Sequence, residues 1–346
     1  MADPDQTADL DPVRVLRRIA FLLERAHEST YRVRAFRGAA AALRGRDLDQ
    51  VAALSRSGEL RRLRGVGDVT ARCVAESLAG EEPDYLRRLQ ATEGSDLADA
   101  AADLRAALRG DCHSHTDASD GGSPLAEMVE TARELGHEYL VITDHSPRLT
   151  VANGLSPERL RAQLRDVAEL NATLVDTGFR VLTGIEVDIL EDGSLDQEPD
   201  LLAELDVVVA SVHSKLRMSA PEMTERMLTA VANPHVDVLG HCTGRMVTGS
   251  RKRPESQFDA DAVFAACADH GVAVEINSRP ERLDPPQRLL RLAVEADCLF
   301  TIDTDSHAPG QLDWLVAGCA RAATCDVPPE RVLNTWPVER LLDRTR

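Results

Sequence analysis

Seven short apolar runs, separated by longer amphipathic stretches, follow residue 110 and constrain the fold more than any other feature of the sequence. The runs lie near Cys112 and at 139–143, 179–187, 205–212, 236–240, 272–276 and 299–303. Stretches with helical spacing lie between and after them, at 123–136, 156–176, 219–232, 258–270, 285–296 and 309–324. Strands that alternate with helices in this way pair in parallel, so the pattern predicts an α/β sheet or barrel.

Polar residues stand where these apolar runs end. The first run is followed by HSH, the second by TDH, the third ends at Glu186, the fourth at His213, the fifth at His241, and the seventh is followed by DSH. In β/α barrels the carboxyl ends of the strands meet at one mouth, where active sites form. Six of the ten histidines and three carboxylates are therefore expected to converge there.

This convergence favours a metal site. A single HxH motif is more often a pair of solvated loop histidines. Six imidazoles buried at successive strand ends without a metal would leave unpaired polar groups, at a cost of several kcal/mol. Imidazole with carboxylate suits Zn, Mn or Fe better than Mg or Ca. Nine donors are too many for one tetrahedral ion, so the sequence predicts two or three divalent metals.

The motifs also resemble a known family. HSHTDASDGG, TDHS, GIEVDI, SVHSKL, GHCTGR, EINSRP and DTDSH, in this order, resemble the polymerase and histidinol phosphatase (PHP) family over about residues 110–340. That resemblance implies a distorted (β/α)7 barrel that holds up to three metals. It also implies a phosphoesterase that hydrolyses phosphate esters with a metal-activated water and needs no seryl or cysteinyl nucleophile.

The resemblance implies the following ligands, position by position. His113, His115, Glu186 and Asp305 would bind a first metal, and Glu186 would bridge to a second metal held by His213 and His241. A third metal would use Asp120, His145 and His307. Some family members have histidine where this chain has Asp120. Asp144 could orient His145 or simply cap a loop.

Cations near the strand ends are candidates for binding the phosphate ester. Lys215 and Arg217 follow His213, while Arg279 and Arg282 follow the sixth run. The alternative is a solvated rim or ion pairs with an acidic surface. We expect Glu186, Asp305, Lys215 and Arg279 to be the catalytic residues.

The amino-terminal part differs in charge and pattern. Residues 11–90 contain 16 arginines and 11 acidic residues, whereas residues 91–346 carry a net charge of -20. The stretch RRLRGVGDVTARCVAESL (61–78) resembles a helix-hairpin-helix motif, in which glycines allow close approach to a DNA phosphate. We expect DNA contacts from Arg61, Arg62, Arg64, Gly65 and Gly67; a tight turn between helices is the alternative.

Residues 19–43 resemble the DNA-end-binding domain of bacterial family X DNA polymerases, which often carry a PHP domain. Only about twenty residues separate the two modules here, and no paired-aspartate polymerase motif is found, so we expect no polymerase activity. Lys215 and Lys252 are the two lysines, which disfavours Schiff-base lyase chemistry in the amino-terminal module.

The expected organisation has four parts: a disordered tail (1–10), an all-α DNA-binding module (11–90), a linker helix (91–109) and the PHP barrel (110–346). No apolar run is long enough to span a membrane, and no signal peptide is recognised at the amino terminus. Seven scattered cysteines without CxxC spacing suggest neither a disulfide framework nor a cysteine zinc site, so we expect a cytoplasmic protein.

Three functions are compatible with these features. The favoured one is a metal-dependent phosphoesterase at DNA 3′ ends, either a 3′–5′ exonuclease or a 3′-phosphatase. The second is a small-molecule phosphatase of histidinol-phosphate or nucleotide type, which gives the amino-terminal module no role. The third is a non-catalytic DNA-binding adaptor, which the complete set of ligand residues argues against.

Overall fold

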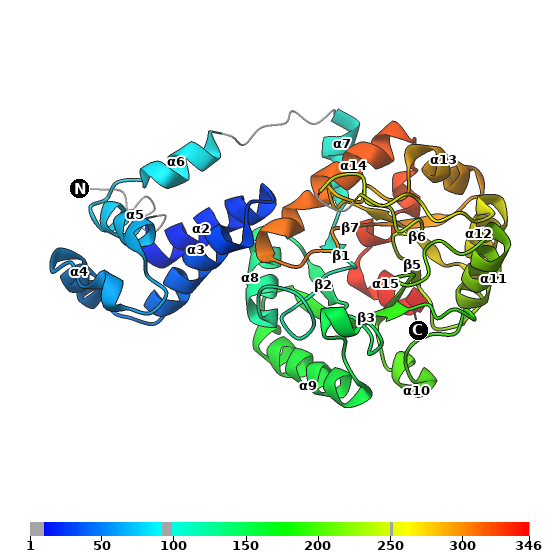
Figure 1. The fold of residues 1–346 in the computed structure, drawn as a ribbon, viewed down its shortest axis with the longest axis horizontal. Coiled ribbons are helices and arrows are strands. Elements are labelled where there is room, and N and C mark those ends of the chain that lie inside the picture. Colours follow the sequence, from blue (N-terminus) through cyan, green and yellow to red (C-terminus); the bar gives the residue numbers. More distant parts are fainter. Residues whose placement is uncertain (1–9, 92–98, 250–251, 346) are drawn as a thin grey trace. The chain divides into compact units, whose positions relative to one another are not determined.

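The computed structural model describes residues 10–91, 99–249 and 252–345 (Figure 1). The chain divides into two compact units, residues 1–96 and 97–346. The predicted disordered tail falls almost wholly outside the described residues. Within the predicted linker, helix α7 (Asp99–Ala107) packs against the last long helix of the second unit, α14 (Leu315–Thr324).

The first unit is entirely helical. Its elements are α2 (Pro12–Arg25), α3 (Thr30–Leu43), α4 (Leu48–Arg56), the 3₁₀ turn η1 (Leu60–Arg62), α5 (Asp68–Leu78) and α6 (Asp84–Gln90). Helix α2 begins at Pro12 because the Asp11 side chain accepts hydrogen bonds from the amides of Val13 and Arg14. Its apolar face, including Ile19 and Leu23, is buried and packs on α3 and α5.

The hairpin between α4 and α5 depends on one glycine. Gly65 has φ +96°, and a Cβ there would lie 2.9 Å from the Gly38 carbonyl oxygen in α3. Glycine is therefore required both by the backbone conformation and by the close approach of α3. Val66 is buried beneath the turn, while Gly67 precedes α5 and its amide donates to Thr70 Oγ1.

The second unit is a seven-stranded parallel barrel, which confirms the predicted α/β architecture. The strands are β1 (Gly110–Asp111), β2 (Tyr139–Ile142), β3 (Arg180–Asp188), β4 (Val207–Ser211), β5 (Val238–Leu239), β6 (Ala273–Asn277) and β7 (Leu299–Asp303), and they pair in this order. Beyond β1 and β7, Ser114 forms a parallel bridge with Ser306. The barrel is therefore nearly closed.

Asn334 fills the gap between the first and last strands. Its side chain accepts from the amide of Ile302 at 3.0 Å and donates to the carbonyl oxygens of Ile302 and Gly110. Asn334 is fully buried. Its amide group thus satisfies backbone groups at both edges that would otherwise be unpaired.

Helices surround the barrel (Figure 1). They are α8 (Leu125–Glu134), α9 (Pro157–Leu174), α10 (Pro199–Leu202), α11 (Ala220–Val231), α12 (Ala260–His270), α13 (Gln287–Glu295), α14 and α15 (Val338–Thr345). The predicted helix 309–324 begins as the 3₁₀ helix η3 (Pro309–Trp314) and continues as α14. Short 3₁₀ turns also occur at η2 (Thr150–Ala152), η4 (Pro329–Arg331) and η5 (Leu333–Thr335).

The barrel interior is apolar at one end and polar at the other. Tyr139, Leu182 and Val207 belong to a buried cluster that also includes Leu341 and Leu342 of α15. This cluster fills the end at which the strands begin. The carboxyl ends of the strands, by contrast, are lined by buried histidines, carboxylates and hydroxyl groups. Among the described residues, none of the helices is both long and apolar enough to cross a membrane.

Candidate metal centre

The six histidines predicted from the strand ends lie at one mouth of the barrel. His113 and His115 follow β1, His145 follows β2, His213 follows β4, His241 follows β5 and His307 follows β7. Neighbouring rings are close: the centroids of His115 and His145 are 4.4 Å apart, and those of His115 and His307 are 4.3 Å apart. The parallel register brings residues that are far apart in sequence to this mouth.

Glu186 of β3 lies at the centre of the histidines and is fully buried. Its Oε1 lies 3.2 Å from His213 Nε2 and 2.8 Å from His241 Nε2. Its Oε2 lies 2.8 Å from His145 Nδ1 and 3.4 Å from His113 Nε2. The two oxygens thus face different histidines, an arrangement that suits a carboxylate shared between two ions.

A second carboxylate, Asp120, approaches the cluster from the loop after β1. Its Oδ1 lies 3.5 Å from His145 Nε2 and 3.3 Å from His307 Nε2. Together with His115 these residues form one group of four donors whose ligand atoms lie within 4.8 Å of one another. The Asp120 side chain is 34% exposed, so this group is the most open to solvent.

Two further donor groups share Glu186. One contains His113, His115 and Glu186, and the other contains His145, Glu186 and His213. His115 and His145 therefore each belong to two groups, unlike in the predicted assignment. Among the described residues, Asp305 and His241 lie near the cluster but outside these groups. Asp305 Oδ1 is 3.4 Å from His115 Nε2 and also pairs with Arg279, and His241 Nε2 is 2.8 Å from Glu186 Oε1.

The site is strongly coupled electrostatically. Burial alone would raise the pKa of Glu186, but the adjacent His213, His113 and His145 hold it well below its usual range. Burial would lower the pKa of His213, but Glu186 and Asp188 raise it to about 9. For His115, burial and the nearby His307 and His145 lower the pKa.

The donor atoms fit bound cations. Several buried atoms in the cluster have no hydrogen-bond partner among the described residues, namely His113 Nε2, both ring nitrogens of His115, His145 Nδ1, Glu186 Oε2, His213 Nε2 and His241 Nδ1. The 2.8 Å contact between His145 and Glu186 lacks hydrogen-bond geometry. Unpaired buried donors and acceptors are costly, and a divalent cation between imidazole and carboxylate groups would satisfy them.

Two carboxylates that the sequence analysis missed support the histidines from behind. Glu275 Oε1 lies 2.5 Å from His113 Nδ1, and Asp188 Oδ1 lies 3.0 Å from His213 Nδ1. Both residues were detectable in principle. Glu275 interrupts the apolar run 272–276, and Asp188 lies two residues after Glu186, on the same face of β3.

Asp144 does not orient His145. Its carboxylate accepts hydrogen bonds from the amide and hydroxyl of Thr116, at 2.9 and 2.6 Å, and from Ser119 and Gln163. These bonds hold the loop that carries Asp120. The loop-capping interpretation of Asp144 is therefore the correct one.

The four predicted cations differ in their positions. Arg279 Nη1 lies 3.0 Å from His307 Nδ1 and 3.4 Å from Asp305 Oδ1, and Arg282 Nε donates to Asp305 Oδ2 at 3.0 Å. Both arginines thus border the cluster. Lys215 is 61% exposed and its Nζ lies 3.8 Å from Glu191 Oε1, and Arg217 is exposed on the same loop.

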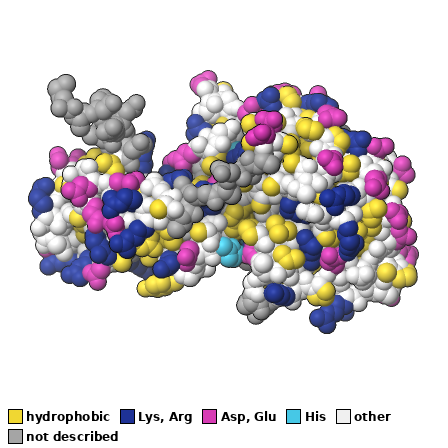
Figure 2. All heavy atoms as spheres, turned by 90° about the horizontal axis from the view of Figure 1, so that it is seen from above, with side chains coloured by type: hydrophobic (Ala, Val, Ile, Leu, Met, Phe, Trp, Pro, Cys, Tyr) yellow, Lys and Arg dark blue, Asp and Glu magenta, His cyan; other side chains and the backbone are white. Residues whose placement is uncertain are grey.

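The predicted DNA-binding residues lie together at the hairpin between α4 and α5. Arg61, Arg62 and Arg64 are exposed, but Arg61 pairs with Asp68 at 2.6 Å and Arg62 pairs with Glu59. Figure 2 shows basic and acidic side chains interspersed on the visible face of this unit. Exposed pairs of this kind contribute little energy, so they do not prevent the arginines from meeting a phosphate.

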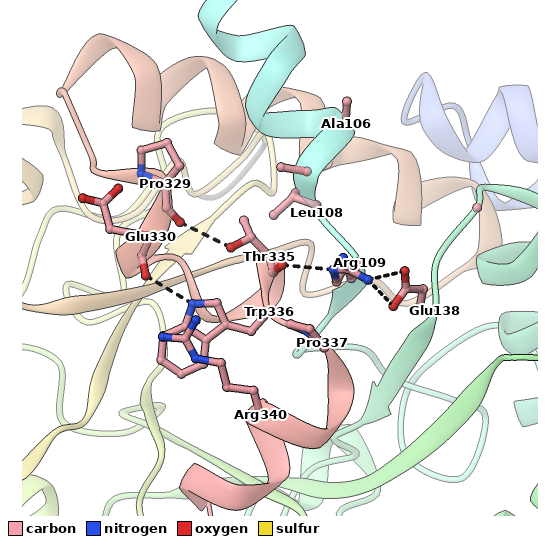
Figure 3. A pocket seen from close by; sticks show the side chains of 12 residues that line it. Ala106, Leu108, Arg109, Glu138, Pro329, Glu330, Thr335, Trp336, Pro337 and Arg340 are labelled. Atoms are coloured by element: carbon pink, nitrogen blue, oxygen red, sulfur yellow. Dashed lines mark hydrogen bonds and ion pairs between the residues drawn. The ribbon is translucent and has the colours of Figure 1, made fainter.

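A cavity of about 500 Å³ lies where the strands begin (Figure 3), lined by residues that include Arg109 just before β1 and Glu138 just before β2. Arg109, just before β1, donates to both oxygens of Glu138, and Arg340 stacks on Trp336 at 3.6 Å. The cavity contains no predicted site residue. Arg109 is paired with Glu138 and Arg340 is stacked on Trp336, so we assign the cavity no role.

Comparison with known proteins agrees with this geometry. The PHP domain family matches residues 111–279, and a helix-hairpin-helix domain family matches residues 9–82. The chain is 38% identical over 227 residues to the DNA polymerase/3′-5′ exonuclease PolX of Bacillus subtilis, which covers 66% of this chain but 39% of that protein. The chain therefore spans well under half the length of that relative.

Other relatives are shorter. A probable phosphatase of Edwardsiella ictaluri is 30% identical over 247 residues, covering 67% of this chain and 92% of that protein. The histidinol phosphate phosphatase of Lactococcus lactis, solved with zinc, L-histidinol and phosphate, is 20% identical with a TM-score of 0.46, covering 63% of this chain and 92% of that one. From its barrel, its motifs and the 30% identical probable phosphatase, the chain belongs to the PHP-domain family of phosphoesterases, and it carries an amino-terminal helix-hairpin-helix domain.

Proposed function

We propose that this protein is a metal-dependent phosphoesterase that acts on DNA 3′ ends, as a 3′–5′ exonuclease or a 3′-phosphatase. The observation that carries the proposal is the cluster of imidazoles around Glu186 at the barrel mouth, several of whose buried ring nitrogens have no hydrogen-bond partner among the described residues. The helix-hairpin-helix domain in the same chain, and the similarity to a protein named as a 3′-5′ exonuclease, support DNA as the substrate.

The proposed ligands are the nine residues predicted from the sequence, with Glu186 shared between two ions of Zn or Mn, or alternatively Fe. Bound divalent ions would supply Lewis acidity toward the phosphoryl oxygens and would lower the pKa of a water. Hydrolysis adds water across the P–O bond and yields a phosphate or phosphomonoester and an alcohol.

The chain's own residues orient the substrate. Arg279 and Arg282 border the cluster, and each guanidinium has several N–H donors that suit phosphate oxygens. Burial alone would raise the pKa of Asp305, but Arg279 and Arg282 hold it well below its usual range. Asp305 therefore stays ionised beside them and would limit how far either guanidinium can move toward substrate.

The amino-terminal unit would hold the DNA backbone. Within the hairpin, the amides of Val66 and Gly67 are already bonded to Leu63 and Thr70. Phosphate contact would therefore fall to the exposed Arg61, Arg62 and Arg64, to Gly65, and to amides in the first turn of α5. Gly67 would contribute through close approach of its backbone.

A small-molecule phosphatase is the second candidate. The similarity to a probable phosphatase favours it. The matching segment covers 92% of that protein and is about as long as the barrel of this chain. In that case the enzyme would act on a histidinol-phosphate-like or nucleotide-like monoester, and the amino-terminal unit would not affect turnover.

A panel of substrates separates the two candidates. Full-length protein with added Mn²⁺ would be assayed on 3′-labelled duplex DNA and on phosphomonoesters, beside the double variant Arg61→Gln, Arg64→Gln. If the protein acts on DNA ends, the variant should raise the KM for DNA several-fold and leave turnover of p-nitrophenyl phosphate unchanged. Intact DNA together with rapid cleavage of one monoester would support the second candidate instead.

A further inference from the structure

Glu275, in the middle of β6, is the carboxylate with the closest contacts to the predicted ligands from outside their set. It is fully buried. Its Oε1 lies 2.5 Å from His113 Nδ1, and its Oε2 accepts from the backbone amide of His241 at 2.5 Å. Asn277 Nδ2 donates to the same Oε2 at 3.2 Å.

These contacts fix the direction in which His113 can act. An ionised carboxylate only accepts hydrogen bonds, so His113 Nδ1 must carry the hydrogen of the neutral ring. The lone pair is then on Nε2, which lies 3.4 Å from Glu186 Oε2 and has no hydrogen-bond partner. Glu275 therefore turns the free nitrogen of His113 toward the centre of the cluster.

The same carboxylate holds the backbone of a second predicted ligand. His241 has φ +20°, an uncommon conformation for a residue with a side chain. Such conformations persist where the surroundings determine them. Because Glu275 accepts the His241 amide while His241 Nε2 lies 2.8 Å from Glu186 Oε1, one residue of β6 fixes ligands that follow β1 and β5.

An independent pair in the same site has a related arrangement. Asp188 Oδ1 accepts from the backbone amide of His213 at 3.1 Å and lies 3.0 Å from His213 Nδ1. Here too a carboxylate takes the outward nitrogen, leaving Nε2 toward Glu186. Hydrogen bonds of this kind fix the tautomer and orientation of metal-binding histidines in general.

We propose that Glu275 is a positioning residue of the metal centre, which sets the tautomer of His113 and the backbone of His241 so that both present nitrogen to the ions around Glu186. This role rests on the proposed function, because it requires that the cluster binds metal. Glu275 itself touches neither ion nor substrate.

The test is metal affinity in the full-length protein, measured by calorimetric titration of chelator-treated protein with Mn²⁺, with bound metal counted by elemental analysis. In Glu275→Gln the amide oxygen can still accept at one of the two positions, but the NH2 group faces a donor at the other. We expect affinity to fall by about 10- to 100-fold. The matched control is Asp237→Asn. Asp237 lies just before β5, and its carboxylate accepts a hydrogen bond from the amide of Val208 in β4. The Mn²⁺ affinity of this variant should equal that of wild type.

The outcomes distinguish the two levels of the proposal. If wild type binds Mn²⁺ and Glu275→Gln binds it equally well, the positioning role is wrong and the proposed function stands. If wild type binds neither Mn²⁺ nor Zn²⁺, the proposed function fails first, and the role with it. Should Glu275→Gln not fold, Glu275→Asp decides, because its shorter carboxylate cannot reach both partners; wild-type affinity in that variant would overturn the role.

Discussion

At the scale of single residues, Glu186 is a buried carboxylate surrounded by histidines. Four histidines, His113, His145, His213 and His241, lie within 3.4 Å of its two oxygens. A buried carboxylate among imidazoles is stable only if charges and lone pairs are balanced. The proposed ions would provide that balance. A substitution of Glu186 should therefore reduce both metal binding and hydrolysis.

Glu186→Gln should reduce hydrolysis more than any change outside the ligand set. The amide replaces one shared oxygen with a donor, which cannot bind a cation. We expect a loss of more than about 100-fold, beyond the range typical for residues behind the ligands. Steady-state rates and metal content would be measured together, and a variant that keeps full metal content and full rate would contradict this assignment.

The buried side chain of His137 should make the stability of the folded protein fall at acidic pH, independently of the metal centre. It is 6% exposed, and neither ring nitrogen has a partner among the described residues. Burial, followed by nearby Arg105, lowers its pKa to about 3. Because the pKa in the unfolded chain is near 6.5, the folded state excludes the proton, and stability is complete above about pH 6.5 and falls as the pH decreases toward the folded pKa.

The expected slope is about 1.4 kcal/mol per pH unit below pH 6 from this one group. His137→Leu should remove it, so that wild type and variant differ by a pH-dependent amount in urea unfolding at pH 7, 6 and 5. His270→Leu, at the exposed carboxyl end of α12, is the control. Parallel pH profiles for wild type and His137→Leu would show that His137 accepts a proton in the folded protein.

At the scale of elements, the sequence predicted the barrel well because each strand is a short apolar run bounded by polar residues. The end at which the histidines meet followed from strand direction alone. The residues Glu275 and Asp188 were visible in the strand pattern, but their partners were not, since pairing Glu275 with His113 depends on which side chains of β6 and of the segment after β1 face each other inside the barrel. Asn334 between β1 and β7 was equally hidden, because its partners are about 30 and 220 residues away.

The hairpin of the amino-terminal unit allows a test of one element. Gly65→Ala places a Cβ 2.9 Å from Gly38 O and also strains a φ of +96°. Gly58→Ala has a comparable φ of +70° with open space around it, so it controls for backbone strain. We expect Gly65→Ala to destabilise its unit by about 1–3 kcal/mol more than the control, from steric overlap.

DNA turnover by Gly65→Ala should fall while turnover of p-nitrophenyl phosphate is unchanged. Thermal unfolding and both assays would be followed in the full-length protein. Equal stability of the two glycine variants would mean that α3 can shift away from the added Cβ without loss of folding free energy. The hairpin geometry would then not depend on Gly65.

At the scale of the whole molecule, charge divides the chain into unlike parts. The net charge is -18, yet residues 11–90 are basic. An acidic enzyme can bind DNA only through local contacts, and these are sensitive to salt. If Arg61, Arg62 and Arg64 each neutralise one phosphate, raising salt from about 50 to 200 mM should weaken DNA binding roughly 40-fold.

Fluorescence anisotropy with labelled duplex DNA would measure that slope. The KM for a small phosphomonoester should change far less over the same range, because it does not use the amino-terminal unit. A DNA affinity that is independent of salt would argue against phosphate contacts by these arginines.

The most direct test of the central claim is hydrolysis by full-length protein from which metal has been removed with a chelator, before and after Mn²⁺ or Zn²⁺ is restored. The 3′-labelled duplex and the phosphomonoester panel would be assayed together, with His113→Ala alongside wild type. We predict no hydrolysis of any substrate without metal, recovery when metal is added to wild type, and no recovery in His113→Ala. Hydrolysis that persists without metal, or that His113→Ala retains in full, would contradict the assignment of the histidine cluster as the active site.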